Sequence, residues 1–294
     1  MALAATFSAS AQQKYTVSIK NNLKSALNDV PATLDLRKLK DVKSATVIVD
    51  GKEIPYQIDD LDGNGTNDEL CFLVDLEGKQ TKTATITLSD KANDKQWKAR
   101  TFAEMVLRNP KVKEKNKHDI YLSSITIDKR TTNPYNVLHH HGVAFESELI
   151  ATRIYMDKRQ TIDLYGKFHK GLELEQTQFY TSKEQKAQGY GDDVLWVGNT
   201  FGLGAFRGWN GTEPTLLEDV KHRTQRILTT GPLRTIVEVE DNQWTITPGA
   251  EPVNATIRYT LYAGHRDFDV DVTFNKDVSA YEFSTGIINV KNST

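Results

Sequence analysis

Three consecutive histidines, His139, His140 and His141, form the first candidate site in the sequence. Imidazole exchanges protons near neutral pH, so two histidines on one face can act as acid and base or bind a metal. In a strand, His139 and His141 would share a face and His140 would point the other way. The alternative is a surface loop in which one imidazole binds a backbone carbonyl. Because Glu146 and Arg153 follow closely, the pattern favours a catalytic site.

Tyr190 and the carboxylates Asp192 and Asp193 form a second candidate group, interleaved with glycines. Carboxylates accept hydrogen bonds from sugar hydroxyls, and an aromatic ring stacks on the C–H face of a sugar. The same residues could instead cap a turn before a strand at Val194–Val197. We predict a sugar-binding edge here and add Lys167, from the upstream segment, to the substrate-binding residues.

Arg207 and Trp209 end a glycine-rich stretch that begins at Gly198. The stretch lacks the Lys-Ser/Thr ending of a phosphate-binding loop, and no helix-forming segment follows it. Small residues at this spacing indicate the close approach of two strands or of a ligand. If the stretch is a strand, Arg207 and Trp209 share a face and offer an acidic sugar a charged fork beside a stacking plane. The alternative is a surface ion pair of Arg207 with Glu213 or Glu218.

Asp60, Asp62, Asn64 and Asp68 form a candidate metal site. Their oxygens fall at alternate positions of a loop spaced like the calcium loop of an EF-hand. The bidentate glutamate that closes such a loop is missing, because Cys71 stands in its place. The alternative is a polar β-hairpin turn, since Asp-Gly and Asn-Gly are turn dipeptides. The prediction is a structural Ca²⁺ site that takes no part in catalysis.

Strands are the elements that must position these residues. The chain has 294 residues, 38% hydrophobic and 26% charged, as in a globular protein. Short runs that alternate apolar and polar residues predict a small β-sandwich over residues 12–95. Longer runs of the same kind predict a larger β domain over residues 119–294. The charged stretch 96–118 predicts a solvated linker with one short helix around 102–107.

Charge and the N-terminus bear on partners and location. The net charge of −2, from 37 basic and 39 acidic residues, argues against a nucleic-acid-binding surface. No stretch approaches the roughly 20 apolar residues that span a membrane. Residues 1–11 combine a short apolar run with an Ala-Ser-Ala cleavage pattern and predict the remnant of a signal peptide. The alternative is a tail of small residues. We therefore expect an exported protein, periplasmic or secreted.

Two long stretches, HHHGVAFESELIATRIYMDKRQTIDLYGK (139–167) and QGYGDDVLWVGNTFGLGAFRGW (188–209), resemble a family known only as a domain of unknown function. DLDGNGTNDELCFLVDLEG (60–78) resembles the N-terminal part of that family. Its members sit in polysaccharide-utilisation loci of glycan-degrading bacteria. The resemblance spans most of residues 15–290. It implies a small β-sandwich followed by a galactose-mutarotase-like β-supersandwich, incomplete at the C-terminus, and exported work on acidic oligosaccharides.

The first functional hypothesis is β-elimination on a uronate-containing oligosaccharide by a lyase or dehydratase. Arg153 or Arg207 would neutralise the substrate carboxylate, which makes the C5 proton more acidic. A histidine of the run 139–141, or Tyr190, would remove that proton, and a second of these residues would protonate the leaving oxygen. This chemistry requires no cofactor.

Two alternatives stay open. Glycoside hydrolysis needs two carboxyls about 5–9 Å apart, which Glu146 and one carboxylate of the second group could supply. A glycan-binding protein without catalytic activity would use Tyr190, Trp196 and Trp209 as stacking platforms.

Overall fold

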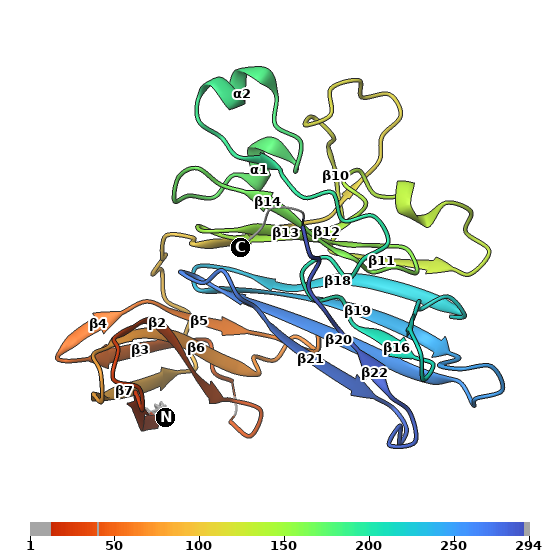
Figure 1. The fold of residues 1–294 in the computed structure, drawn as a ribbon. Coiled ribbons are helices and arrows are strands. Elements are labelled where there is room, and N and C mark those ends of the chain that lie inside the picture. The colour runs from red at the N-terminus through yellow and green to blue at the C-terminus, as the bar shows by residue number, and fades with distance from the viewer. Residues whose placement is uncertain (1–12, 40, 291–294) are drawn as a thin grey trace, which may run out of the picture. The chain divides into compact units, whose positions relative to one another are not determined.

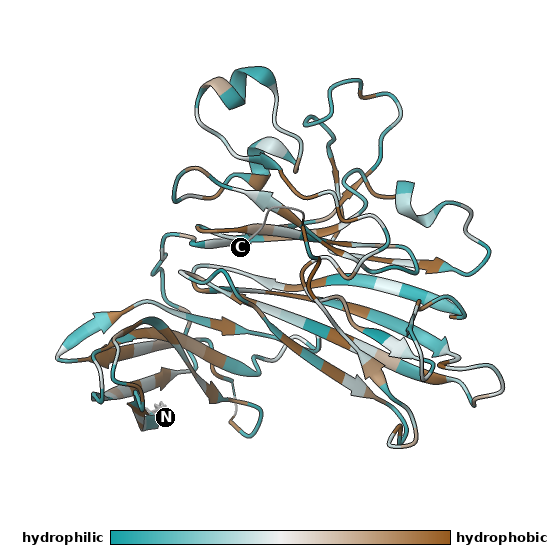
Figure 2. Ribbon diagram, viewed as in Figure 1, coloured by the Kyte–Doolittle hydropathy of each residue, from teal (hydrophilic) through white to brown (hydrophobic). Residues whose placement is uncertain are grey.

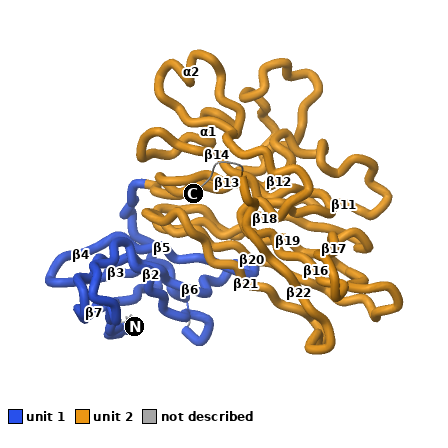
Figure 3. The backbone as a smooth tube through the Cα atoms, viewed as in Figure 1, with its two compact units in different colours: residues 1–98 blue, residues 99–294 orange. Residues whose placement is uncertain are grey.

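The computed structural model describes residues 13–39 and 41–290 (Figure 1). Strands hold 45% of the residues and helices 4%, which confirms the prediction of a mainly β protein. Apolar and polar residues alternate along many of these strands (Figure 2). The predicted signal-peptide remnant, residues 1–11, lies outside the described residues. The chain divides into two compact units, residues 1–98 and 99–294 (Figure 3).

Unit 1 consists of two antiparallel sheets, with the strand orders β1–β7–β3–β4 and β2–β6–β5. The strands are β1 (Gln13–Lys20), β2 (Leu27–Asp35), β3 (Ser44–Val49), β4 (Lys52–Ile54), β5 (Tyr56–Asp59), β6 (Glu69–Leu76) and β7 (Thr81–Ser89). In β7, Ala84, Ile86 and Leu88 are buried and the residues between them are partly exposed. The alternation therefore turns one face of β7 toward the core.

Unit 2 contains two five-stranded antiparallel sheets. Sheet I has the order β15–β14–β13–β12–β8, and its strands are β8 (Thr101–Glu104), β12 (Gly142–Ser147), β13 (Ala151–Tyr155), β14 (Ile162–Gly166) and β15 (Asp192–Asp193). Sheet II has the order β11–β18–β19–β20–β21, and its strands are β11 (Ser124–Asp128), β18 (His222–Thr230), β19 (Arg234–Trp244), β20 (Val253–Tyr262) and β21 (Asp269–Phe274).

Both sheets of unit 2 contribute to one hydrophobic core. Val143, Phe145 and Ile154 from sheet I pack in the same cluster as Val239 and Ile257 from sheet II. Because side chains alternate along a strand, the residues between the core positions of β12, β13 and β14 point away from sheet II. We call this second face the outer face of sheet I.

Shorter elements complete unit 2. They are β9 (Val106–Leu107), β10 (Ile120–Tyr121), the 3₁₀ helix η1 (Pro134–Asn136), α1 (Leu174–Thr177), α2 (Lys183–Ala187), β16 (Arg207–Trp209), β17 (Pro214–Thr215) and β22 (Phe283–Ser284). Both α-helices lie between β14 and β15 in the chain and on the outer side of sheet I (Figure 1). They belong to the loops that cover that face.

Two expectations about local structure were wrong. The stretch 96–118 is not a solvated linker with a helix, because it contains β8 and β9 and buries Ala103 and Met105 in the core of unit 2. Tertiary pairing with β12 overrides the weak local signal of this short apolar segment. The expected strand at Val194–Val197 is also absent, since β15 ends at Asp193 and the following residues line a cavity. Among the described residues, no helix is long and apolar enough to cross a membrane.

Candidate functional site

A row of residues crosses the outer face of sheet I. Glu104, Ala144, Arg153 and Asp163 lie directly opposite one another on β8, β12, β13 and β14. All four are buried, so the loops above them exclude solvent from this polar face. Ala144 packs in a small hydrophobic cluster with Leu174 and Phe179 from the segments above the row.

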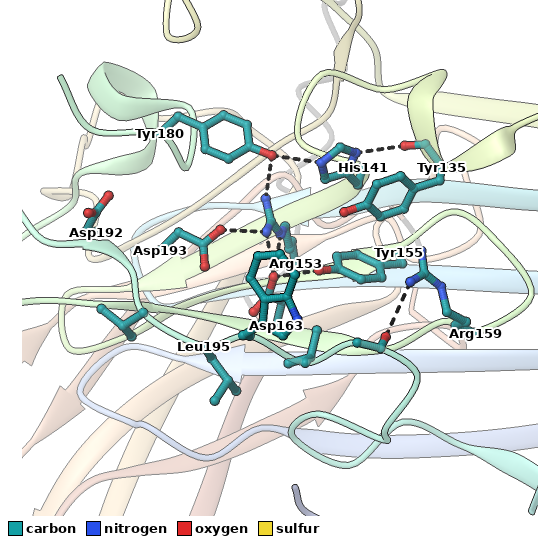
Figure 4. Close-up of a pocket in the computed structure, with 14 residues that line it drawn as sticks. Tyr135, His141, Arg153, Tyr155, Arg159, Asp163, Tyr180, Asp192, Asp193 and Leu195 are labelled. Carbon is teal, nitrogen blue, oxygen red and sulfur yellow. Dashed lines mark hydrogen bonds and ion pairs between the residues drawn. The ribbon is translucent and has the colours of Figure 1, made fainter. Parts of the chain in front are cut away.

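A cavity of about 630 Å³ lies above this row on the β14 side (Figure 4). Its volume is in the range of small-molecule binding sites, roughly 300–1,000 Å³. Aromatic and ionisable side chains form most of its wall: Tyr135, His141, Arg153, Tyr155, Arg159, Asp163, Tyr180, Asp192, Asp193 and Trp196. The rest of the wall consists of Val194, Leu195, Val197 and Gly198.

Arg153 is the centre of the hydrogen-bond network beneath the cavity. Its guanidinium donates to the carboxylate of Asp163 at 3.0 Å through Nε and to that of Asp193 at 2.8 Å through Nη2. Its Nη1 donates to the hydroxyl of Tyr180 at 3.1 Å, and Phe179 packs 4.1 Å from its centre. Burial lowers the pKa of Arg153, but Tyr180 and the two carboxylates raise it by a larger amount. The net pKa lies above its ordinary value, so the side chain stays charged. Only 3% of the residue is exposed, which makes it an anchor for its neighbours.

Tyr180 continues the network to His141. The Tyr180 hydroxyl lies 2.9 Å from His141 Nε2, and His141 Nδ1 lies 2.9 Å from the carbonyl oxygen of Tyr135. A carbonyl only accepts, so Nδ1 carries the proton and Nε2 is the acceptor. The Tyr180 hydroxyl therefore donates to His141 while it accepts from Arg153. The result is a directed chain from Arg153 through Tyr180 to His141 (Figure 4).

Both groups of this chain are neutral near pH 7. Burial lowers the pKa of His141 to about 4, and the nearby Arg153 lowers it as well. Burial raises the pKa of Tyr180, although Arg153 acts in the opposite direction. A neutral imidazole that accepts from a phenol can take up its proton, and Arg153 then stabilises the phenolate. The arrangement can therefore perform general acid–base chemistry at the cavity wall.

The histidine run is a turn and not a strand, so its three side chains point to three different places. His141 has a φ of 74°, and its ring lines the cavity and stacks on Tyr135 with 3.6 Å between ring centroids. His139 stacks on His118, with 4.0 Å between ring centroids. His140 is completely buried, and its Nε2 lies 3.2 Å from Oε1 of Glu104. Only His141 lines the cavity.

Glu104 and His140 are both uncharged near neutral pH. Burial raises the pKa of Glu104 to about 8 and lowers that of His140 to about 3. No hydrogen bond joins these two side chains, and burial is the main cause that keeps the Glu104 carboxyl protonated. The folded pKa of Glu104 lies above its ordinary value of 4.5, so the folded state holds a proton that the unfolded state releases as pH rises.

We therefore expect Glu104→Gln to flatten part of the pH dependence of stability. In the wild type, the contribution of Glu104 is complete below about pH 4.5 and is lost as pH rises through about 8. The glutamine keeps the shape and a donor but does not titrate. Between pH 5 and pH 8 the wild type should therefore lose roughly 2–4 kcal/mol more unfolding free energy than the variant.

Urea unfolding of unit 2 at four pH values between 5 and 8 measures this difference. Glu114→Gln, at an exposed carboxyl of the same unit, is the control and should follow the wild type. A constant difference between Glu104→Gln and the wild type over this range would mean that Glu104 is ionised in the folded protein.

The other predicted site residues divide into two groups. Asp192 and Asp193 line the cavity, and Asp192 also forms an ion pair with Lys186. Tyr190 and Trp209 do not line it. One residue of the histidine run and two residues of the Tyr-Gly-Asp-Asp segment therefore meet at one cavity.

Lys167 is a structural residue of the loop above sheet I. Its side chain is 1% exposed and donates to the carboxylate of Glu146 and to the carbonyls of Ser147 and Gly171. Glu146 also accepts the backbone N–H of Leu174 at 2.9 Å, so it fixes the start of α1. Neither Lys167 nor Glu146 reaches the cavity.

Arg207 is also buried away from the cavity, with 4% of its surface exposed. Its guanidinium donates to the backbone carbonyls of Thr200 at 2.6 Å and Asn199 at 3.0 Å, and to the hydroxyl of Thr161 at 3.1 Å. These bonds hold the glycine-rich loop against β14. At Gly202 a Cβ would lie 1.8 Å from the carbonyl oxygen of Ile162, so the glycine allows two segments to approach closely.

Sequence reasoning missed several residues of the cavity. Asp163 is the one charged residue in the apolar strand β14, and this contrast is visible in the sequence alone. Tyr180 carries no signal, because it follows α1 in an irregular loop and meets His141 across 39 residues of sequence. Arg159 looked like an ordinary turn residue.

The predicted metal loop joins β5 and β6 in unit 1. One carboxylate oxygen each of Asp60, Asp62 and Asp68 lies within 4.8 Å of the other two. Asp60 accepts the backbone N–H of Gly65 at 2.7 Å, which is the largest cause that lowers the pKa of its carboxyl. The Asn64 oxygen accepts the N–H of Thr66, and one oxygen of Asp68 accepts the N–H of Leu61.

Ca²⁺ is expected to raise the melting temperature of unit 1. Three carboxylates that already face one another gain a cation partner, and binding to the folded state stabilises it by mass action. Asp62→Asn should abolish the increase, whereas Asp90→Asn, at an exposed position outside the loop, should preserve it. Calorimetry with Ca²⁺ and Mg²⁺ measures the shift. If neither cation changes the melting temperature or releases heat, the loop is a turn stabilised only by its own hydrogen bonds.

Comparison with known proteins identifies the family but not the activity. A search of curated proteins returns no match to this chain. The family model described as a domain of unknown function, DUF4861, matches residues 19–294. Because this match covers almost the whole chain, the protein belongs to the DUF4861 family.

Proposed function

We propose that the protein is an exported enzyme that acts by β-elimination on a uronate residue of an oligosaccharide bound in the cavity above sheet I. The observation that carries the proposal is the position of the Tyr180 hydroxyl, held at the cavity wall between the guanidinium of Arg153 and the imidazole of His141. The resemblance to a galactose-mutarotase-like family of polysaccharide-utilisation loci supports the same class of substrate.

Trp196 supports a sugar ligand. It lines the cavity and 95% of its surface is exposed, so its indole ring is open to a ligand. A flat indole at the edge of a polar cavity can stack on the C–H face of a sugar ring. Asp192 and Asp193 lie on the same stretch and can accept hydrogen bonds from sugar hydroxyls.

Arg159 is the group best placed to bind the substrate carboxylate. Arg153 and Arg207 were the predicted ligands, but both guanidiniums are buried and bound to protein oxygens. Arg159 lines the cavity with 20% of its side chain exposed. Its Nε and Nη2 bind Asp157, whereas Nη1 has only a long contact of 3.3 Å to the carbonyl of Gly198. The Nη1 group is therefore available to a carboxylate.

The elimination uses the chain from Arg153 to His141. Tyr180 passes its phenolic proton to His141 Nε2, and Arg153 stabilises the phenolate. The phenolate takes the C5 proton of the uronate, the C–H electron pair forms the C4–C5 double bond, and the C4–O bond breaks. Tyr180 then gives a proton to the leaving oxygen and recovers one from His141. Both residues return to their starting states.

The charge-separated form of Tyr180 and His141 is a minor state of the free protein, because burial keeps the pKa of His141 near 4. A bound carboxylate at Arg159 stabilises the imidazolium by Coulombic attraction. The same carboxylate, when it accepts hydrogen bonds from Arg159, makes the C5 proton more acidic. Substrate binding and proton removal are therefore coupled through charge.

Hydrolysis is less well supported by this geometry. Glu146, the predicted partner of the Asp192 and Asp193 carboxylates, is fully buried under Lys167 and does not line the cavity. Asp163 is 1% exposed and bound to Arg153, so it cannot flank a glycosidic bond. Glycan binding without catalysis remains the second candidate function, and the exposed Trp196 is the observation that favours it.

A panel of oligosaccharides tests the proposal. Uronate-containing di- and trisaccharides of several linkages, with neutral oligosaccharides as controls, are incubated with the protein while absorbance at the unsaturated-uronate band is followed. The proposal expects new absorbance with at least one uronate substrate and none with the neutral sugars. Binding of uronate oligosaccharides without any change in absorbance or mass would leave a binding protein and overturn the enzymatic proposal.

A further inference from the structure

A second cavity, of about 820 Å³, adjoins the first in unit 2. The two share Tyr135 and Arg159 in their walls. In the first cavity these two residues lie at the opposite end from Asp192 (Figure 4). The second cavity continues beyond them toward sheet II, where Ile127 of β11 and Arg223 of β18 contribute to its wall. One ligand that passes Arg159 would therefore contact both cavities.

The shared wall is rigid and charged. The guanidinium of Arg159 stacks 4.7 Å from the ring centre of Tyr135 and 5.0 Å from that of Tyr155. Asp157, which holds Arg159 by two nitrogen–oxygen contacts, lies in the wall of the second cavity. Arg159 is thus fixed where the cavities meet, with its Nη1 group toward the Gly198 side of the first cavity.

The lining of the second cavity suits hydroxyl-rich ligands. It offers amide and hydroxyl groups from Thr131, Asn133 and Asn199. Most of its charges are already paired with each other, such as Lys158 with Glu218. Lys129 adds an exposed ammonium group at the wall. Such a mixture of neutral polar groups, paired charges and the ammonium group of Lys129 fits sugar hydroxyls and an occasional acidic substituent.

We propose that the second cavity is a binding subsite for the sugar that neighbours the reacting uronate in the same chain. This inference rests on the proposed function, because it takes the reacting uronate to bind in the first cavity. Arg159 then marks the boundary between the reacting residue and the next one. The substrate is an oligosaccharide, and a free monouronate uses only half of the site.

Equilibrium binding to a monouronate and to its trisaccharide tests the inference. Calorimetry is performed with Tyr180→Phe protein, which prevents turnover, and the first pair of probes is galacturonate and trigalacturonate, followed by the other uronates of the panel. The trisaccharide is expected to bind at least about tenfold more tightly than the monouronate. Asn199→Trp fills the second cavity from an exposed position, and Lys129→Ala removes its ammonium group.

Both second-cavity variants should reduce trisaccharide affinity toward that of the monouronate and leave monouronate affinity unchanged. Lys111→Ala, at an exposed lysine that lines neither cavity, should change neither affinity. If every uronate binds equally well as monomer and trimer, or if Asn199→Trp leaves the trisaccharide advantage intact, the subsite is wrong while the proposed function stands. If no uronate binds in either form, the proposed function itself fails.

Discussion

Replacing Tyr180 with phenylalanine is expected to reduce the rate of elimination by about 10²–10⁴-fold, the usual contribution of a positioned acid–base group. The variant loses only the hydroxyl that lies between Arg153 and His141. The ring keeps its packing, so the cavity and its affinity for substrate should change little. The rate is measured from absorbance at the unsaturated-uronate band, and affinity is measured by calorimetry.

Tyr190→Phe is the matched control, because Tyr190 was the tyrosine favoured by sequence alone and it does not line the cavity. Its elimination rate should equal that of the wild type. A Tyr180→Phe protein that retains full activity would remove Tyr180 from the mechanism. A loss confined to Tyr190→Phe would instead point to a different arrangement of the loop before β15.

Replacing Arg153 with methionine is expected to lower the unfolding free energy of unit 2 by about 3–5 kcal/mol, the cost of leaving a buried charge unpaired. Asp163 is 1% exposed and keeps only the hydroxyl of Tyr155, at 2.8 Å, as a side-chain donor once the guanidinium is gone. The double variant Arg153→Met with Asp163→Asn should recover most of the loss, since it removes both charges. Urea unfolding at pH 7 measures each value.

Arg130→Met is the control for this experiment. Arg130 also pairs with an aspartate, Asp128, but its side chain is 85% exposed, so the change should leave the unfolding free energy nearly unchanged. Elimination should also fail in Arg153→Met protein, because Tyr180 loses the donor that stabilises its phenolate. A small cost at Arg153, equal to that at Arg130, would mean that water reaches the row beneath the cavity.

The sequence predicted the strands well where alternation runs over five or more residues. β7 and β20 show such alternation, and their apolar residues are buried. β8 was missed because its four residues, Thr101–Glu104, are too few to establish a period. The segment Val194–Val197 was wrongly taken as a strand, since its apolar residues serve the cavity wall, and Trp196 is exposed.

Only part of the candidate site could be predicted from the sequence, and the reason is physical. His141, Arg153 and Asp193 stand out as charged or titratable residues beside strands, and the structure brings them to one cavity. Their roles depend on Tyr180, which no local pattern marks. Conversely, Arg207 had a suggestive glycine-rich context but binds backbone carbonyls, which a sequence cannot show.

The mass of the products from a uronate trisaccharide tests the central claim most directly. β-Elimination breaks the C4–O bond without consuming water, so the product masses must sum to that of the substrate, with one fragment carrying the C4–C5 double bond. If the leaving group is hydroxide, the substrate instead loses one water and keeps its length. Both results agree with Tyr180 as the base above Arg153. Products whose masses sum to the substrate plus one water, without new absorbance, would show hydrolysis and contradict the proposed mechanism.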